Sequence, residues 1–134
     1  MSSHVMSITY LPKIPAVLSG ECTQTIRRKG KKQICVGDII SFHGWQVRPY
    51  RSPWSWRKRV VVTDVYDIDV SRYWLGFAGE PGGYLWNSDL CNKIATEDFI
   101  DPPTGEALRD ALFGLNGAPK EPAEYQIIRW EPTA

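Results

Sequence analysis

The sequence lacks the long apolar segments of membrane and exported proteins. No apolar run approaches the roughly 20 residues that a membrane-spanning helix needs. The first residues, MSSHVMSITYLPK, contain neither a basic segment nor a long apolar segment of the kind found in signal peptides. We therefore expect a soluble, cytoplasmic protein without a membrane partner.

Cysteine and histidine are scarce. The three cysteines, Cys22, Cys35 and Cys91, are odd in number and form no C-x-x-C pair, which argues against a disulfide framework or a zinc ribbon. Reduced thiols are expected. His4 and His43 are the only histidines, so we expect neither a histidine-based triad nor a two-histidine metal site, and neither a metal nor a cofactor.

Length and charge indicate one domain with an uneven surface. A chain of 134 residues with 43% hydrophobic residues can bury a core as a single domain over residues 1–134. The net charge of +1 conceals a sorting of charges: residues 1–63 hold 11 basic and 2 acidic side chains, whereas residues 64–134 hold 5 and 13. This asymmetry favours a basic face for a polyanion, provided that the fold does not interleave the two halves.

Apolar periodicity and turn residues predict the order of elements. The expected strands cover 7–11, 23–28, 39–45, 57–70, a glycine-rich hairpin within 72–88, and 124–132. One helix is expected over 14–19, ended by Gly20, and a second within 96–117, with a buried stripe of Leu108, Leu112 and Leu115 and an end at Gly117. About five to six strands with two short helices and no βαβ alternation predict an α+β fold resembling a small β-barrel.

The stretch SGECTQTIRR, residues 19–28, has the pattern of a site rather than of core or plain loop. It follows the end of the first expected helix. If it is extended, Thr23, Thr25 and Arg27 lie on one face. Three side chains able to donate hydrogen bonds would then line up beside a helix end, where they can bond a base edge or a phosphate.

Two basic tracts are candidates for contacts with nucleic acid. RRKGKK covers residues 27–32, and RPYRSPWSWRKR covers residues 48–59. Cations can pair with phosphates while neighbouring aromatic rings stack on bases, although the first tract also fits a solvated loop and the tryptophans also fit a core. Tyr84 fits either a stacking surface or the packed end of a barrel. The candidate contacts are Thr23, Arg27, Arg28, Lys31, Lys32, Arg48, Arg51, Trp54, Trp56, Arg57, Lys58, Arg59 and Tyr84.

The stretch SGECTQTIRR followed by VGDIISFHGW resembles ASCH domains, which share the PUA-like barrel. Their signature is a short helix ending in Gly-x-Lys-Thr-x-Thr-x-Arg, then a Gly-Asp turn that opens a strand, and later an acidic stretch before a helix and a final strand. These parts occur here in the same order from about Ile8 to Trp130, so the resemblance implies a PUA-like domain with its core over about 8–130.

The resemblance implies recognition of RNA or of a nucleoside in a cleft beside the first helix. In some members it implies hydrolysis of N4-acetylcytidine by a lysine, a threonine and a glutamate. Thr25 and Arg27 match the family pattern, but Cys22 occupies the position of the lysine. For the carboxylate, Asp101 is the first choice ahead of Glu97 and Asp98, all three of which also fit simple helix capping.

Three functions stay open from the sequence. The leading hypothesis is a module that binds RNA or single-stranded nucleic acid through a nucleotide-recognition cleft. The second is a hydrolase, either an amidohydrolase acting on an N4-acylated cytidine-type nucleoside or a ribonuclease, with Thr25 or Cys22 as nucleophile and Asp101 as its partner. The third is a protein-interaction module whose basic face binds an acidic partner.

Overall fold

The computed structural model describes residues 2–8, 13–30, 33–45, 54–114, 117 and 121–131, with backbone alone at 45 and 54–57. The described strands are β1 (Ser3–Ser7), β2 (Gln24–Arg28), β3 (Ile39–Trp45), β4 (Trp54–Val70), β5 (Trp74–Phe77), β6 (Tyr84–Leu85) and β7 (Ala123–Trp130). The described helices are α1 (Ile14–Ser19), α2 (Asp89–Glu97) and α3 (Gly105–Phe113). The mixed α+β class is confirmed, with seven strands and three helices in this part of the chain.

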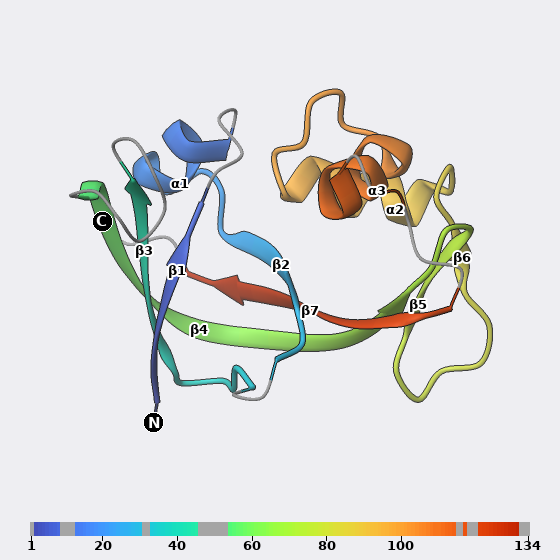
Figure 1. Ribbon diagram of the computed structural model, residues 1–134, viewed down its shortest axis with the longest axis horizontal. Coiled ribbons are helices and arrows are strands. Elements are labelled where there is room, and N and C mark those ends of the chain that lie inside the picture. Colours follow the sequence, from blue (N-terminus) through green and yellow to red (C-terminus); the bar gives the residue numbers. More distant parts are fainter. Residues whose placement is uncertain are drawn as a thin grey trace.

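Strand β4 organises the sheet, because it is long enough to pair with different strands along its length. Its first half is antiparallel to β3, its second half is antiparallel to β7, and its last residues also pair with β5. Beyond these, β1 runs parallel to β3, β2 antiparallel to β7, and β6 antiparallel to β5. Figure 1 shows β4 as a strongly curved ribbon that spans the molecule.

In the part of the chain that the structure describes, the sheet is not closed into a barrel. The order β1-β3-β4-β7-β2 would close if β1 and β2 paired, but no ladder joins these two strands within the described residues. A side chain links them instead, since Arg27 Nη2 donates to the carbonyl oxygen of Ser7 at 2.6 Å. The expected barrel is therefore not supported, and β1 and β2 present facing edges.

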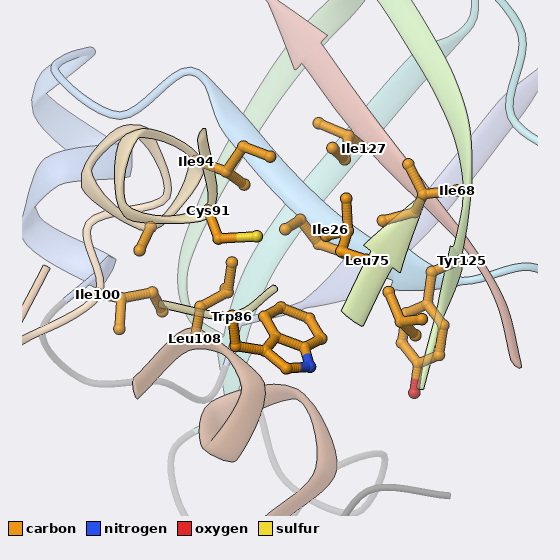
Figure 2. Packing of buried hydrophobic residues seen from close by; sticks show 12 residues of the cluster. Ile26, Ile68, Leu75, Trp86, Cys91, Ile94, Ile100, Leu108, Tyr125 and Ile127 are labelled. Carbon is orange, nitrogen blue, oxygen red and sulfur yellow. The ribbon is translucent and has the colours of Figure 1, made fainter. Parts of the chain in front are cut away.

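One hydrophobic core lies between the sheet and the helices α2 and α3. Figure 2 shows Cys91 and Ile94 of α2 directed toward Ile26 and Ile127 of the sheet. The indole of Trp86 is buried in the same cluster, and its Nε1 donates to the carbonyl oxygen of Ser71 at 2.9 Å. This core holds the helices against β2 and β7.

A second hydrophobic core lies around α1 and β3. Phe42 of β3 and Trp130 of β7 pack there with ring centroids 4.9 Å apart. Along β7, Ile127 contributes to the first core whereas Ile128 and Trp130 contribute to the second. Because β7 is covered on both faces, its sequence is apolar without strict alternation.

The helix ends follow local sequence signals. Pro15 lies in the first turn of α1, and Gly20 ends that helix with a φ of 87° that favours glycine, as expected. The hydroxyl of Thr104 accepts a hydrogen bond from the backbone N–H of Ala107 at the start of α3. Gly114, rather than Gly117, follows the last helical residue of α3.

Several sequence expectations need correction. Helix α2 was not predicted, so the acidic residues expected at the start of a helix lie at the end of α2 and in the connection to α3. β1 begins at Ser3, before the strand expected over 7–11, and residues 9–11 of that expected strand lie outside the described residues. β4 begins at Trp54, so the tryptophans of the second basic tract belong to a strand rather than a loop. Of the stripe predicted for α3, Leu108 is buried, Leu112 is half-buried, and Leu115 lies outside the described residues.

The basic half of the sequence, residues 1–63, and the acidic half, residues 64–134, are only partly separated in the fold. In Figure 1, α1, β1 and β3 gather at one end, and α2, α3, β5 and β6 at the other. Strands β2 and β7 pair between the two ends, and Lys29 of the basic half lies 3.6 Å from Asp67 of the acidic half. Among the described residues, no helix is both long and apolar enough to cross a membrane.

Asp38 fastens β1 to the turn before β3. Its carboxylate accepts hydrogen bonds from the backbone N–H groups of Ser2 at 3.0 Å and Cys35 at 2.9 Å, and from His4 Nε2 at 2.9 Å. The bond from Ser2, followed by those from His4 and Cys35, holds the pKa of Asp38 well below its usual range. The ionised carboxylate is therefore part of the native fold.

Replacing Asp38 with asparagine should destabilise the protein at neutral pH, since an amide NH2 then faces N–H donors. A carboxyl whose folded pKa is lowered stabilises the native state above its unfolded pKa of about 3.9, and this stabilisation is lost as the pH falls through the folded pKa. Urea unfolding at a series of pH values should show the gap between wild type and D38N narrowing below about pH 4. D110N, at an exposed carboxylate, is the control; a gap independent of pH would contradict this role.

Gly105 should not tolerate a side chain. A Cβ there would collide with the carbonyl oxygen of Trp86 and lie 2.6 Å from Cβ of Cys91. We expect G105A to lower the free energy of unfolding by about 1–3 kcal/mol, because backbone must move to make room. G30A is the matched control, since a Cβ at Gly30 would have nothing within 4 Å. Equal stability of the two variants would show that α3 does not pack against this segment as described.

Candidate functional site

A cavity of about 160 Å³ lies at the free edge of β2. Polar side chains from separate elements line it: Ser7 from β1, Lys13 before α1, Thr25 and Arg27 from β2, and Asp98 after α2. The volume is below the roughly 300–1,000 Å³ of drug-sized ligand sites. The cavity therefore suits one ring or one small head group.

The apolar side of the cavity comes from the helical end of the molecule. Ile100 follows α2, and Leu108 and Leu112 belong to α3. Ile100 and Leu108 also belong to the first hydrophobic core, so their positions are fixed by packing. An apolar wall opposite convergent polar groups is the usual composition of a binding site.

A buried ion pair forms the polar base of the cavity. Lys13 Nζ donates to Asp98 Oδ1 at 2.9 Å, and the two residues are 5% and 4% exposed. Burial raises the pKa of the Asp98 carboxyl, and the positive charge of Lys13 opposes that rise. A buried charged pair that lines an opening is a mark of functional sites, because desolvated charges are costly to keep without a use.

Thr25 and Arg27 complete the polar side. Thr25 is 3% exposed and lines the cavity, and Arg27 is half-buried. The positive charge of Arg27 also opposes the rise in the pKa of Asp98, so Arg27 acts electrostatically on a group of the same cavity. Two cations against one carboxylate leave the cavity with a net positive charge. It should attract an anion or an electron-rich ring.

Gln24 forms hydrogen bonds that hold the Asp98 side of the ion pair in place. Its Nε2 donates to the carbonyl oxygen of Ile94 at 3.3 Å and to Asp98 Oδ1 at 3.4 Å. Its Oε1 accepts from Arg129 Nε at 3.0 Å, and Arg129 also bonds Glu97. The network ties β2, β7 and the end of α2 together, and so fixes the direction of the Asp98 carboxylate.

Two residues expected in the site lie elsewhere. Cys22 is fully buried in the second core, and its thiol donates to the carbonyl oxygen of Gln24 at 3.4 Å. Burial raises the pKa of Cys22, against the smaller opposing effect of Lys13, which keeps the thiol neutral and weakly nucleophilic. Asp101 is exposed and does not line the cavity. Lys13 and Asp98 line the cavity, whereas Cys22 and Asp101 are not among its lining residues.

Lys13 was missed because nothing local marks it. It precedes a proline-containing helix and resembles any surface lysine in the sequence. Asp98 was named as an alternative to Asp101 without a reason to prefer it. Their pairing joins positions 85 residues apart, and sequence spacing carries no signal for such a contact.

The basic tracts lie only partly within the described structure. Lys31, Lys32, Arg48 and Arg51 fall outside the described residues, and Trp54, Trp56 and Arg57 are described by backbone alone. Of the other candidates, Arg28 and Arg59 are exposed, Lys58 donates to the carbonyl oxygen of Leu18 at 3.3 Å, and Thr23 is half-buried. Tyr84 is 42% exposed on β6, edge-on to Phe77, and does not line the cavity.

Comparison with family models, with curated proteins and with solved structures finds no match for this chain. Within the described residues, no group of three or more histidine, cysteine, aspartate or glutamate side chains is placed to hold a metal ion.

The energetic coupling of Lys13 and Asp98 is open to a direct test. Either K13M or D98N alone should cost about 3–5 kcal/mol of unfolding free energy, because the remaining polar partner stays buried without its counterpart. The double variant should lose less than the sum of the two single losses. Urea unfolding measures all three variants, with the exposed pair of Arg109 and Asp110 as a near-additive control. Additive losses at Lys13 and Asp98 would contradict a buried pair.

Proposed function

We propose that this protein binds RNA or single-stranded nucleic acid and that the cavity at the edge of β2 receives one nucleotide. The observation that carries the proposal is the meeting of Thr25 and Arg27 with the buried Lys13–Asp98 pair around one small, positively charged cavity. Thr25 and Arg27 are the residues that the ASCH-like pattern singles out, and this supports the same assignment.

The side chains offer the groups that a base edge needs. The Lys13 ammonium donates hydrogen bonds, the Asp98 carboxylate accepts them, and the Thr25 hydroxyl does both. Leu108 and Leu112 provide an apolar surface for the face of a ring. Because the polar groups are buried, a ligand that leaves them unsatisfied binds poorly, which gives the cavity a basis for discrimination.

Charge outside the cavity supports a polyanionic ligand. Strand β2 ends at Arg28, which is exposed, and Arg59 is exposed on β4. Cations of this kind contact phosphates and release counterions, so affinity for a polymer falls as the salt concentration rises. A neutral small molecule held by hydrogen bonds alone lacks this dependence.

Hydrolysis of an acylated nucleoside is the second candidate, and one observation favours it. Lys13 brings an ammonium into the cavity with Thr25, although Cys22 stands at the lysine position of the ASCH-like pattern. In this reading Lys13 stabilises the negative charge that develops on the acyl oxygen, and Asp98 accepts a proton from water or from Thr25. When water attacks the acyl carbon, the acyl C–N bond breaks, the amine takes the proton held by Asp98, and the acyl group leaves as a carboxylic acid. When Thr25 attacks instead, the amine leaves in the same way, and a water molecule then hydrolyses the Thr25 ester to release the carboxylic acid.

The test of binding uses the tryptophan fluorescence of the purified protein. We expect single-stranded RNA or DNA to bind more tightly than duplexes and more weakly at higher salt. T25V keeps the shape of Thr25 but removes its hydroxyl, and should weaken binding about tenfold. T25S keeps the hydroxyl and should bind almost as the wild type does. If the wild type and T25V bind nucleic acid with equal affinity, the Thr25 hydroxyl does not contribute to the site.

The same preparations distinguish the second candidate. Each is incubated with N4-acetylcytidine and with RNA, and the products are resolved by mass spectrometry. Recovery of unchanged N4-acetylcytidine and RNA, together with salt-sensitive binding, supports binding without hydrolysis. Release of acetate that is lost in T25V, without binding of any polymer, would contradict the leading proposal and favour the hydrolase.

A further inference from the structure

A second cavity, of about 340 Å³, lies along the gap between β1 and β2. Residues Ser3 to Met6 of β1 form one side, and Arg28 and Gly30 at the end of β2 form the other. The cavity occurs where the sheet fails to close, because no ladder joins β1 to β2 in the described part of the chain. It is therefore bounded by two strand edges rather than by a sealed core.

Arg27 lines both cavities. Its Nη2 donates to the carbonyl oxygen of Ser7 at 2.6 Å, so the side chain crosses the gap between β2 and β1. A ligand in the first cavity and a ligand in the second would both lie against this guanidinium. The two cavities are thus neighbouring compartments of one site rather than separate hollows.

The second cavity carries positive charge without a carboxylate in its lining. Arg27 and Arg28 contribute guanidinium groups, and none of the residues that line it is acidic. The nearby acidic side chains are engaged by other groups: Asp38 accepts from His4, and Asp67 accepts from Gln126 at 3.0 Å and lies 3.6 Å from Lys29. Two guanidinium groups beside strand edges are suited to a phosphate, which they can contact with paired N–H donors.

We propose that the second cavity holds the nucleotide adjoining the one in the first cavity, with the connecting phosphodiester against Arg27 and Arg28. This inference rests on the proposed function, since it assumes that a nucleotide occupies the first cavity. It adds where the next nucleotide of the same chain lies and which side chains contact the phosphate that joins the two nucleotides. Charge complementarity favours this occupant over a strand of polypeptide, whose backbone brings no negative charge.

The test compares mixed-sequence tetraribonucleotides with the four ribonucleoside 5′-monophosphates as probes for the wild type, R28Q and R72Q. The wild type should bind the tetranucleotides about tenfold more tightly, because a second nucleotide adds contacts. R28Q should reduce that advantage about fivefold and reduce the salt slope by about one. R72Q, which removes an exposed arginine that lines neither cavity, should leave the advantage unchanged.

The outcomes separate this inference from the proposed function. Binding of monophosphates without any gain from the tetranucleotides, or equal behaviour of R28Q and R72Q, overturns the inference and leaves the first cavity as a nucleotide site. If neither probe binds the wild type, the proposed function fails and the inference fails with it. A gain that depends on Arg28 and not on Arg72 supports both.

Discussion

The interaction on which the site depends is the buried ion pair between Lys13 and Asp98. It connects the start of α1 with the end of α2, and these helices belong to different hydrophobic cores. A single charge buried at either position would be strongly disfavoured. The pair is tolerated because each ion is the hydrogen-bonding partner of the other. Gln24 then donates to Asp98 from β2, so a strand and two helix ends share one polar junction. This junction forms the polar side of the cavity, and Ile100, Leu108 and Leu112 form its apolar side.

The open sheet gives the junction access to solvent. Had β1 and β2 paired, backbone hydrogen bonds would occupy the space that Arg27 now crosses. The break leaves two strand edges with positive side chains between them, next to a pocket whose base is an ion pair. Proteins usually protect exposed strand edges from pairing with strands of other molecules, and charged side chains on the edge are one means of doing so. Here the same charges suit a polyanion, so protection of the edge and recognition of a ligand can share residues.

The sequence carries the parts of this structure whose signals are local. Pro15 and Gly20 predict both ends of α1, and the Gly37-Asp38 turn precedes β3 as expected. Thr23, Thr25 and Arg27 were expected together beside α1 from their alternation; Thr25 and Arg27 line the cavity, whereas Thr23 does not. Helix α2 was missed because its buried residues, Cys91, Ile94 and Ala95, make a short and weakly apolar stripe. The Lys13–Asp98 pair was missed for a different reason, because only the packing of α1 and α2 on a common sheet brings two ordinary charged residues together.

We propose that a nucleotide binds in the cavity at the edge of β2. Nuclear magnetic resonance of isotope-labelled protein tests it most directly, by following backbone and methyl resonances as a ribonucleoside 5′-monophosphate is added. The account predicts that the largest shifts occur at Thr25, Ile100 and Leu108, which surround the cavity on different elements. Saturable shifts confined to another surface, such as that around Tyr73 and Leu85, would contradict it.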